Sequence, residues 1–529
     1  MQKKKLHIWL PLLFSITMIA GMFIGYKLRD GIPGKNFFYV EKRRPVQEIL
    51  DLVKNRYVDS VDIAALSDSA IMAILFNLDP HSVFIPAEQL QSANEDIVGN
   101  FYGIGIEFNV FKDTLHVINV LKDGPSFKAG LMVGDKILKA GDTLLSGKNI
   151  SIETIRTNLR GPLNAVVNLG ILRNGKPMNV VVSRGVIPLS SVDAAYMIDS
   201  SIGFIRLNKF SQQTYREFML SLESLKKQGL KKLVLDLRGN GGGVLDEAIE
   251  IADEFLEGDK LISYTEGAHL KKKEYRCRRQ GQFENGALVV LADEGSASAS
   301  EILLGALQDW DRATIIGRRT FGKGLVQEQY DLSDKSALRL TVARYFTPLG
   351  RSIQRPYGNG GSAYYEEINN RYTNGGMYYA DSLKNDTSKV YTTKAGKKIY
   401  GKGGITPDYF VAADTSTIGK TTAKLYSKGL LNDFGYQYYL QNPGIRSKYK
   451  TAPDFAKSFK FSDADWQYFQ QEASKDSISL NNITSKEKAF IIQTLTASIA
   501  RQLFRIEGYY EVRNKDDETL LKALEILRK

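Results

Sequence analysis

The sequence LDLRGNGGG occupies residues 235–243 and ends an apolar run that begins at Lys232. The run KLVLDL is typical of a buried strand, and the glycines after it allow a tight turn before the helical pattern VLDEAIEIADEFL. Two more segments follow strand-like runs in the same way, EGSASASEI at 294–302 after ALVVLAD and TFGKGLVQ at 320–327, shortly after ATIIG. Such alternation of strands and helices predicts an α/β layer with a largely parallel sheet. In these sheets reactive groups lie beyond the carboxyl ends of the strands.

The two later segments hold a serine and a lysine that are candidates for acyl-transfer chemistry. Ser298 begins a predicted helix, where free N–H groups and the helix dipole favour negative charge, although a simple N-cap serine has the same position. A serine nucleophile needs a general base. Lys323 is suited to this role if burial lowers its pKa, and otherwise it is a solvated surface lysine. Gln327, four residues later, is placed to hydrogen-bond the lysine amine.

Histidine, the usual base for a serine nucleophile, has no obvious candidate here. The chain has four histidines, and His7 lies in the apolar N-terminal run. His81 and His116 fall in regions of helical and β-rich pattern, and His269 lies in a charged stretch. The lysine is therefore the favoured base.

The glycines of residues 241–243 have a structural and a catalytic interpretation. They suit a tight strand-to-helix turn. They also suit an oxyanion hole, in which backbone N–H groups of Gly241 or Gly242 join that of Ala299 on a tetrahedral oxygen. One loop can serve both purposes.

A β-rich module precedes this region, with short alternating runs between residues 101 and 185. YGIGIEF at 102–108 and DGPSFKAGLMVGDKILKAGD at 123–142 resemble a PDZ domain. In PDZ domains a glycine-rich loop receives a terminal carboxylate, and the adjacent strand edge pairs with the peptide. The expected peptide-binding residues are Gly103, Ile104, Gly105 and Ile106.

The N-terminus carries a membrane signal. Lys3, Lys4 and Lys5 precede an uncharged, mostly apolar run of 21 residues from 6 to 26. About 20 apolar residues span a bilayer as a helix, and the lysines predict a cytoplasmic N-terminus. We expect an uncleaved anchor over residues 1–30, because the run is long for a signal peptide and no A-x-A-like site follows it. A cleaved signal peptide is the alternative. The catalytic part would then lie on the periplasmic side of the cytoplasmic membrane.

Composition narrows the class of protein. The 529 residues, 43% hydrophobic and 25% charged, suit several folded domains. The net charge of +12 is spread along the chain, so nucleic acid is not an expected partner. The single cysteine, Cys277, excludes an intramolecular disulfide and a cysteine-based zinc site.

The ordered motifs DPHS (79–82), the PDZ signatures, LRGNGGG, SASASE, GKG-LVQ and GGITPD together resemble the C-terminal processing peptidase family, also called tail-specific proteases, over about residues 45–410. The resemblance implies that Ser298 is the nucleophile, Lys323 the general base and Gln327 its orienting partner. Alignment on SASE selects Ser298 over Ser296 and Ser300. The resemblance further implies a crotonase-like α/β core and an exported serine endopeptidase that cuts proteins near their C-termini without a metal or cofactor.

We therefore expect a multidomain α+β protein in which a PDZ domain is inserted beside the peptidase core. Residues 358–376 are expected to form a surface loop, and 416–529 carry no recognisable motif, so a substrate platform, a dimerisation element and an adaptor surface all stay open. The expected domains are an anchor (1–30), a helical segment (42–98), the PDZ domain (99–185), the peptidase core (186–357), a core completion with GGITPD (358–415) and a helical C-terminal domain (416–529).

Three other functions compete with this one. A catalytically silent PDZ scaffold would bind exported proteins, but such a scaffold should have lost a dyad residue, and none is lost. A crotonase-type acyl-CoA enzyme conflicts with the export signal. A penicillin-recognising enzyme needs S-x-x-K, whereas Glu301 stands three residues after Ser298. The expected partners are protein substrates bound by their tails and the membrane, with an adaptor protein and a homo-oligomer left open.

Overall fold

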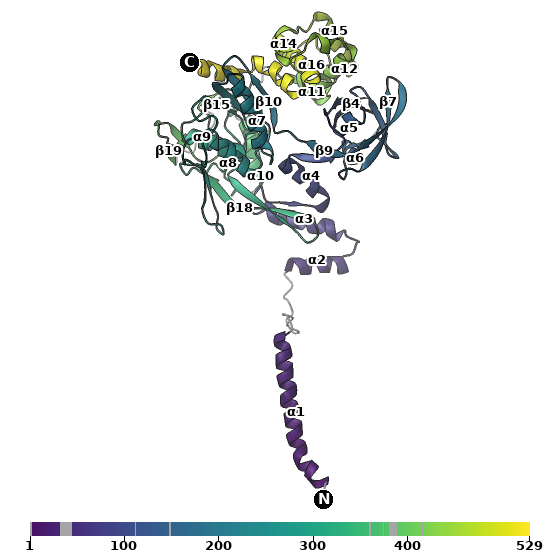
Figure 1. Ribbon diagram of the computed structural model, residues 1–529, viewed down its shortest axis with the longest axis vertical. Coiled ribbons are helices and arrows are strands. Elements are labelled where there is room, and N and C mark those ends of the chain that lie inside the picture. The colour runs from purple at the N-terminus through teal and green to yellow at the C-terminus, as the bar shows by residue number, and fades with distance from the viewer. Residues whose placement is uncertain are drawn as a thin grey trace. The chain divides into compact units, whose positions relative to one another are not determined.

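The computed structural model describes residues 3–31, 45–111, 113–147, 150–358, 361–373, 375–379, 389–414 and 417–529 (Figure 1). The chain divides into two compact units, Met1–Ile71 and Met72–Lys529. Each unit is described by itself.

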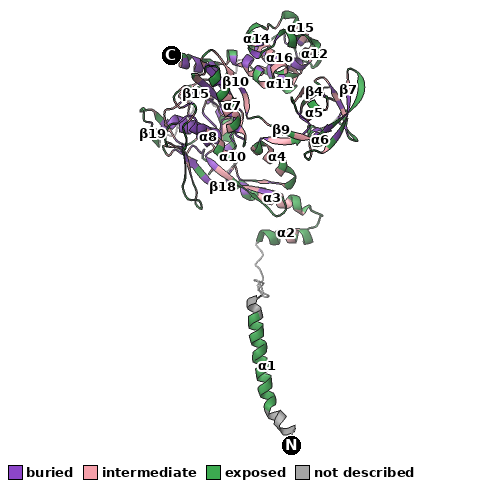
Figure 2. Cartoon of the chain, in the orientation of Figure 1, coloured by how far each residue is buried: buried purple, intermediate pink, exposed green. Residues whose placement is uncertain are grey.

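The first unit is helical. It contains α1 (Lys3–Gly31), α2 (Pro45–Arg56) and the first part of α3 (Ile63–Phe76). Within α1, the 19 residues Trp9–Lys27 are long and apolar enough to cross a membrane, and none of them is buried (Figure 2). At 1.5 Å per residue this span is about 28 Å long, close to the thickness of a bilayer core. A signal sequence would have the same length and composition, so membrane insertion stays a proposal.

The PDZ region of the second unit is a five-strand path with one side strand. Its order is β3-β4-β5-β7-β8, with β6 paired to β5, so β3 is an edge strand. Alternate residues such as Leu115, Val117 and Leu169 are fully buried and form the core of this module. The elements are β3 (Ile106–Phe111), β4 (Thr114–Val120), α5 (Pro125–Lys128), β5 (Lys136–Ala140), β6 (Thr143–Leu144), α6 (Ile152–Leu159), β7 (Val166–Arg173) and β8 (Lys176–Ser183).

A two-stranded ribbon joins this module to the rest of the second unit. Strand β2 (Asn100–Gly103) pairs antiparallel with β9 (Gly185–Pro188), so the chain enters and leaves the PDZ region at one place. Helix α4 (Ala87–Val98) leads into the ribbon and ends at Gly99, which has a left-handed φ of 79°.

The region expected to form the peptidase core is built on a six-stranded sheet of order β10-β11-β12-β15-β16-β21. Only β10 and β11 pair antiparallel, and every other neighbouring pair is parallel, which confirms the expected largely parallel sheet. The strands are β10 (Val192–Met197), β11 (Ile202–Leu207), β12 (Lys232–Asp236), β15 (Ala287–Ala292), β16 (Thr314–Gly317) and β21 (Tyr409–Phe410).

Helices cover both faces of this sheet. On one face α7 (Thr214–Lys227), α8 (Leu245–Asp253) and α9 (Ala299–Asp309) pack in one buried cluster with Leu233 and Leu235. On the other face Val234, the residue between them, packs in a cluster with α17 (Glu518–Arg528). Because successive strand residues point to opposite faces, a continuous apolar strand such as β12 must be covered on both sides.

The last helix therefore belongs to the peptidase sheet. The sequence assigned all of 416–529 to one helical domain, but Leu520, Ala523, Leu524 and Leu527 of α17 lie against the core strands. The remaining helices form a separate aromatic-rich cluster. These are α11 (Lys420–Ser427), α12 (Leu430–Gln441), α13 (Ile445–Lys448), α14 (Ala452–Ser458), α15 (Asp463–Lys475) and α16 (Ser485–Arg513), followed by the turn η2 (Asn514–Asp516).

A second sheet borders the core, in the order β1-β18-β13-β14 with β17 paired to β18. It places the loop before β1 beside the loop before β17. Its strands are β1 (Val83–Ile85), β13 (Leu261–Glu266), β14 (Lys273–Arg276), β17 (Leu325–Asp331) and β18 (Ala337–Phe346). A small hairpin of β19 (Val390–Thr392) and β20 (Lys398–Tyr400) stands apart from both sheets.

The expected surface loop at 358–376 was wrong. Residues Gly361–Thr373 form helix α10. Tyr364 and Arg371 are buried, and Glu367 between them accepts a hydrogen bond from Arg371 Nε at 2.8 Å. These residues recur at three- and four-residue spacing, so a helical face was present beneath the Gly- and Asn-rich composition.

Candidate active site

Three segments predicted to carry chemistry meet in one cavity of about 580 Å³. The turn after β12, the start of α9 and the loop before β17 all line it. The parallel strands β12, β15 and β16 bring these segments together because their carboxyl ends share one sheet edge. Ser298, Lys323, Gln327, Gly241 and Ala299 are among the lining residues.

Ser298 differs from the two neighbouring serines in both exposure and backbone. Ser296 and Ser300 are fully buried, and their hydroxyls donate to the carbonyl oxygens of Leu237 (2.8 Å) and Asn240 (2.9 Å). Ser298 is half-buried and has φ 54° and ψ −114°, a conformation that L residues rarely adopt. Such strain persists where surrounding structure imposes it, commonly at functional sites.

Lys323 lines the same cavity and is half-buried. Burial lowers the pKa of its amine, and Arg339 lowers it further, whereas the carboxylates of Glu301 and Asp79 oppose the shift. The neutral amine that a general base requires is thereby favoured. Among the described residues, no hydrogen bond joins Lys323 Nζ to Ser298 Oγ. The two side chains line the same cavity without contacting each other through a hydrogen bond.

Glu301 holds the serine and lysine loops together. Its carboxylate is fully buried and accepts from Ser298 N (3.0 Å), Gly322 N (2.7 Å), Lys323 N (2.8 Å) and Thr320 Oγ1 (2.5 Å). Burial raises its pKa to about 7, against the opposing effect of these four donors. The residue was noted in the sequence only as evidence against S-x-x-K, although the motif SASASE contains it.

Tyr345 provides a second connection between the two loops. Its hydroxyl lies 3.1 Å from the carbonyl oxygen of Ser298 and 2.5 Å from that of Lys323. Burial raises the pKa of this phenol well above its ordinary value, so it remains a donor. Nothing in the sequence around Tyr345 marks it, because its partners are backbone atoms that only the fold brings near.

The DPHS loop forms another wall of the cavity. Asp79 accepts from the backbone N–H groups of His81 (2.8 Å) and Ser82 (2.9 Å) and from the hydroxyl of Thr341 on β18 (3.0 Å). Because β1 pairs with β18, this loop is fixed beside β17. Gln327 of β17 donates through Nε2 to the same Thr341 hydroxyl, at 3.2 Å, and not to Lys323.

His81 lines the cavity, which its place in a helical segment of the sequence did not suggest. Its Nε2 lies 2.9 Å from the Tyr364 hydroxyl. Burial lowers its pKa to about 4, and the nearby Lys323 charge lowers it too. The ring is therefore neutral at neutral pH.

The glycine turn approaches Ser298 as closely as its backbone allows. A Cβ on Gly242, whose φ is +93°, would lie 2.6 Å from the Ala297 carbonyl oxygen and 2.7 Å from Ser298 Cβ. Only glycine fits this position. The Gly242 N–H donates to Asn240 Oδ1 at 2.9 Å, so in this structure it is engaged and not directed at the cavity.

A buried ion network anchors the turn. Asp236 is fully buried, and although burial opposes its ionisation, Arg238 and Arg206 outweigh it and lower its pKa to about 2. Arg238 also donates to Asp517, the N-cap of α17, at 2.8 and 3.0 Å. The position of the turn therefore depends on the end of the chain.

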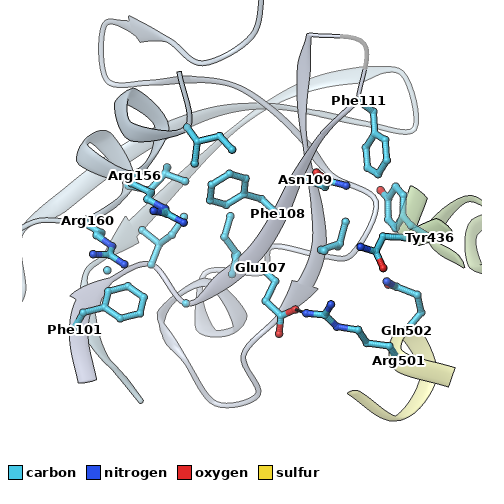
Figure 3. A pocket seen from close by; sticks show the side chains of 18 of the residues that line it. Phe101, Glu107, Phe108, Asn109, Phe111, Arg156, Arg160, Tyr436, Arg501 and Gln502 are labelled. Carbon is cyan, nitrogen blue, oxygen red and sulfur yellow. Dashed lines mark hydrogen bonds and ion pairs between the residues drawn. The ribbon is translucent and has the colours of Figure 1, made fainter. Parts of the chain in front are cut away.

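The four expected PDZ residues lie together in a second cavity, of about 480 Å³, between β3 and α6 (Figure 3). Gly105 has a φ of +75°, and Ile104 is buried.

Within the described residues, no group of three or more His, Cys, Asp or Glu side chains is arranged to hold a metal ion.

Comparisons with known proteins agree with this architecture. A model of peptidase family S41 matches residues 201–359, a PDZ-domain model matches 103–183, and a family of unknown function matches 421–505. Together, the fold and these matches define a PDZ-containing serine peptidase.

Individual relatives identify the family of serine peptidases to which the chain belongs. The carboxy-terminal-processing protease of Bartonella bacilliformis is 36% identical over 316 residues, which cover 58% of this chain and 71% of that protein. The "Probable CtpA-like serine protease" of Staphylococcus aureus is 33% identical over 340 residues, covering 64% and 67%. The photosystem II D1 C-terminal processing protease structure is 28% identical and covers 59% of this chain and 84% of its own, with a TM-score of 0.34. This chain belongs to the carboxy-terminal-processing protease family, which confirms the resemblance stated from the sequence.

Proposed function

We propose that this chain is an exported, membrane-anchored endopeptidase that cleaves protein substrates in or near their C-terminal regions with a Ser298/Lys323 dyad. The observation that carries the proposal is the shared cavity, in which a half-buried serine with a strained backbone lies with a lysine of lowered pKa. Ser296 and Ser300 are less suited because their hydroxyls are buried and bound to carbonyl oxygens.

In the first step neutral Lys323 takes the proton of Ser298, and Oγ forms a bond to the carbonyl carbon of the substrate. The two groups must meet for this transfer. A rotamer change of the long lysine side chain within the cavity would bring Nζ to Oγ, and catalytic hydrogen bonds are often loose before substrate binds. Glu301 and Tyr345 hold the two backbone segments in place while the side chain moves.

The negative charge on the carbonyl oxygen needs backbone donors. Ala299 N–H, at the start of α9, is one proposed donor, and Gly241 or Gly242 supplies the other. Gly242 would have to release Asn240 Oδ1 in order to donate, so we expect the glycine turn to adjust when substrate binds.

The intermediate then collapses. The C–N bond breaks, and protonated Lys323 gives its proton to the leaving amine, which leaves an acyl group on Ser298. A water molecule attacks this ester with Lys323 again as base, and Ser298 recovers its proton. Gln327 is the proposed orienting partner. Because its Nε2 donates to Thr341, its Oε1 is left to accept from the lysine amine.

Recruitment and location complete the proposal. The PDZ groove would receive the C-terminal tail of a substrate, as peptide strands add to open sheet edges in other PDZ domains. Helix α1 would anchor the enzyme with the catalytic unit outside the cytoplasm, which the three lysines before the apolar run support.

Cleavage of an unstructured test protein by the full chain in detergent tests the proposal. We expect Ser298→Ala and Lys323→Ala each to lower turnover at least about a thousandfold, as loss of a nucleophile or its base does in other serine peptidases. Ser300→Ala, the matched control, should keep most activity. Altering the last residues of the test protein should lower cleavage by the wild type.

A catalytically silent PDZ scaffold is the rival function. It predicts tail-dependent binding of the test protein with no cleavage above that of Ser298→Ala. That result, obtained with chain that binds peptide normally, would reject the proposed enzyme.

A further inference from the structure

The region of unknown function contacts the open edge of the PDZ sheet. Asn109 of β3 donates to Asp433 of α12 at 2.8 Å. Phe111, at the end of β3, stacks on Tyr436 of α12 with ring centroids 5.1 Å apart and planes 8° apart. The edge that would receive a peptide is therefore bordered by a second domain.

The same helices line the peptide groove itself. The cavity between β3 and α6 is closed on its third side by residues of α12 and α16, which Figure 3 shows opposite Phe101 and Arg160. We call these residues the C-terminal wall: Asn432, Tyr436, Ser498, Arg501 and Gln502.

Ser498 gives the wall an unsatisfied polar group. It is 3% exposed, and among the described residues its hydroxyl has no hydrogen-bond partner. The close crossing of α12 and α16 holds it there, since a Cβ on Gly435 would lie 2.7 Å from Ser498 Cβ. A buried hydroxyl without a partner is unfavourable. Ser498 lines the groove, so a turn of its side chain toward the groove would let a polar group of a ligand bind this hydroxyl.

Charge indicates the chemistry of that ligand. The groove is lined by Arg156, Arg160 and Arg501 and by a single carboxylate, Glu107. Arg160 is already paired with Glu95, at 2.5 Å, which leaves Arg156 and Arg501 as the arginines that favour an anion. Arg501 lies 3.4 Å from Glu107 in a half-exposed pair, which is weak and open to exchange. An anionic ligand is favoured, and a chain terminus with its carboxylate has this property.

We infer that the C-terminal wall completes the peptide groove, so that α12 and α16 bind the part of a substrate tail that lies upstream of its terminal carboxylate. This inference rests on the proposed function. The tail would add as a strand to β3, with its carboxylate at Gly103–Ile106. β3 is six residues long, about 20 Å, and its contacts with α12, at Asn109 and Phe111, lie toward its far end, so the tail must exceed about four residues to reach α12. Arg501 of α16 lies beside Glu107, near the start of β3, and would contact tail residues closer to the terminus.

Helix α17 is not this ligand. Arg528 pairs with Asp199 at 3.3 Å, and Lys232 Nζ donates to the Leu527 carbonyl oxygen, so the end of α17 is bound to the core sheet.

Fluorescence anisotropy of labelled peptides with the full-length Ser298→Ala chain in detergent tests the inference. A tetrapeptide and a decapeptide share the same apolar C-terminal residues, and the decapeptide carries an acidic side chain upstream. We expect the decapeptide to bind more tightly. The double variant Arg501→Ala/Gln502→Ala should weaken decapeptide binding about tenfold, as loss of a charge-assisted hydrogen bond does. It should weaken binding of the tetrapeptide, which lacks the acidic side chain, by less than about twofold.

Two controls separate the possible failures. Arg446→Ala removes an exposed arginine of the same domain and should change neither affinity. Unchanged decapeptide affinity in the double variant would overturn the inference but leave PDZ recruitment intact. Equal binding of free-acid and amidated peptides would instead contradict tail recruitment. If the double variant changed its oligomeric state while its peptide affinity stayed the same, the C-terminal wall would bind a second copy of the chain and not a substrate tail, and the inference would be overturned.

Discussion

Among single residues, Glu301 matters to the candidate site as much as the proposed nucleophile and base. One buried carboxylate receives donors from the serine loop and from the lysine loop, so the relative position of the two loops is set by a few hydrogen bonds. Shifts of about 1 Å in reacting groups can lower rates a hundredfold. Glu301 is therefore a positioning residue.

Glu301 also makes stability depend on pH. Burial raises its pKa from 4.5 in the unfolded chain to about 7 in the fold, so the folded state holds the proton more tightly. The stabilisation from this group is complete below pH about 4.5 and is lost as pH rises through about 7. We expect the free energy of unfolding of the wild type to fall as pH rises from about 4.5 through about 7. The Glu301→Gln variant should lack this part of the pH dependence.

Urea unfolding followed by the fluorescence of Trp310, in the peptidase core, measures this effect. A Trp9→Phe/Trp466→Phe background leaves Trp310 as the single tryptophan of the chain. The exposed Glu223→Gln serves as the control. An identical pH dependence in wild type and Glu301→Gln would show that Glu301 is not the titrating group.

The sequence predicted which segments line the cavity better than it predicted the contacts that hold them there. Ser298 and Lys323 lie in motifs that follow strands, and the fold brings both into one cavity. Tyr345 and His81 were missed because their roles arise from contacts with segments distant in sequence. Gln327 was expected to bond the lysine but donates to Thr341, a partner that depends on the register of β17 against β18.

At the scale of elements, the strands of the core were predictable and the helices that complete it were less so. Apolar runs such as that of β12 predicted a parallel sheet, which the structure contains. These runs could not indicate which helices cover the two faces of the sheet. Helix α17 covers one face from the far end of the chain, and its N-cap Asp517 holds Arg238 beside the glycine turn. Helix α10 was not predicted, because the Gly- and Asn-rich composition of its segment is typical of a loop.

The packing of α17 predicts a contrast between two adjacent leucines. Leu520 is 2% exposed against the core sheet, whereas Leu521 is 47% exposed. Leu520→Ala should lower the free energy of unfolding of the core by about 2–4 kcal/mol, because it leaves a cavity. Leu521→Ala should change it by less than about 0.5 kcal/mol. The Trp310 fluorescence assay measures both, and equal effects would show that α17 does not pack on the sheet in solution.

At the scale of the whole molecule, the chain combines an apolar N-terminal helix, a PDZ module, a peptidase core and a domain of unknown function. We expect the wild type to stay with membranes after alkaline carbonate extraction, because Trp9–Lys27 buries its apolar surface in lipid. Deletion of residues 1–31 should release it. Recovery of a chain lacking these residues from cells, by N-terminal sequencing, would instead identify a cleaved signal peptide.

Activation of Ser298 by Lys323 is tested by the rate at which a fluorophosphonate probe labels the chain as pH is raised, with the labelled residue identified by mass spectrometry. We expect labelling at Ser298, a rate that rises through a pKa below the ordinary lysine value of about 10.4, and loss of labelling in Lys323→Ala. Labelling at Ser296 or Ser300, or an unchanged rate in Lys323→Ala, would contradict it.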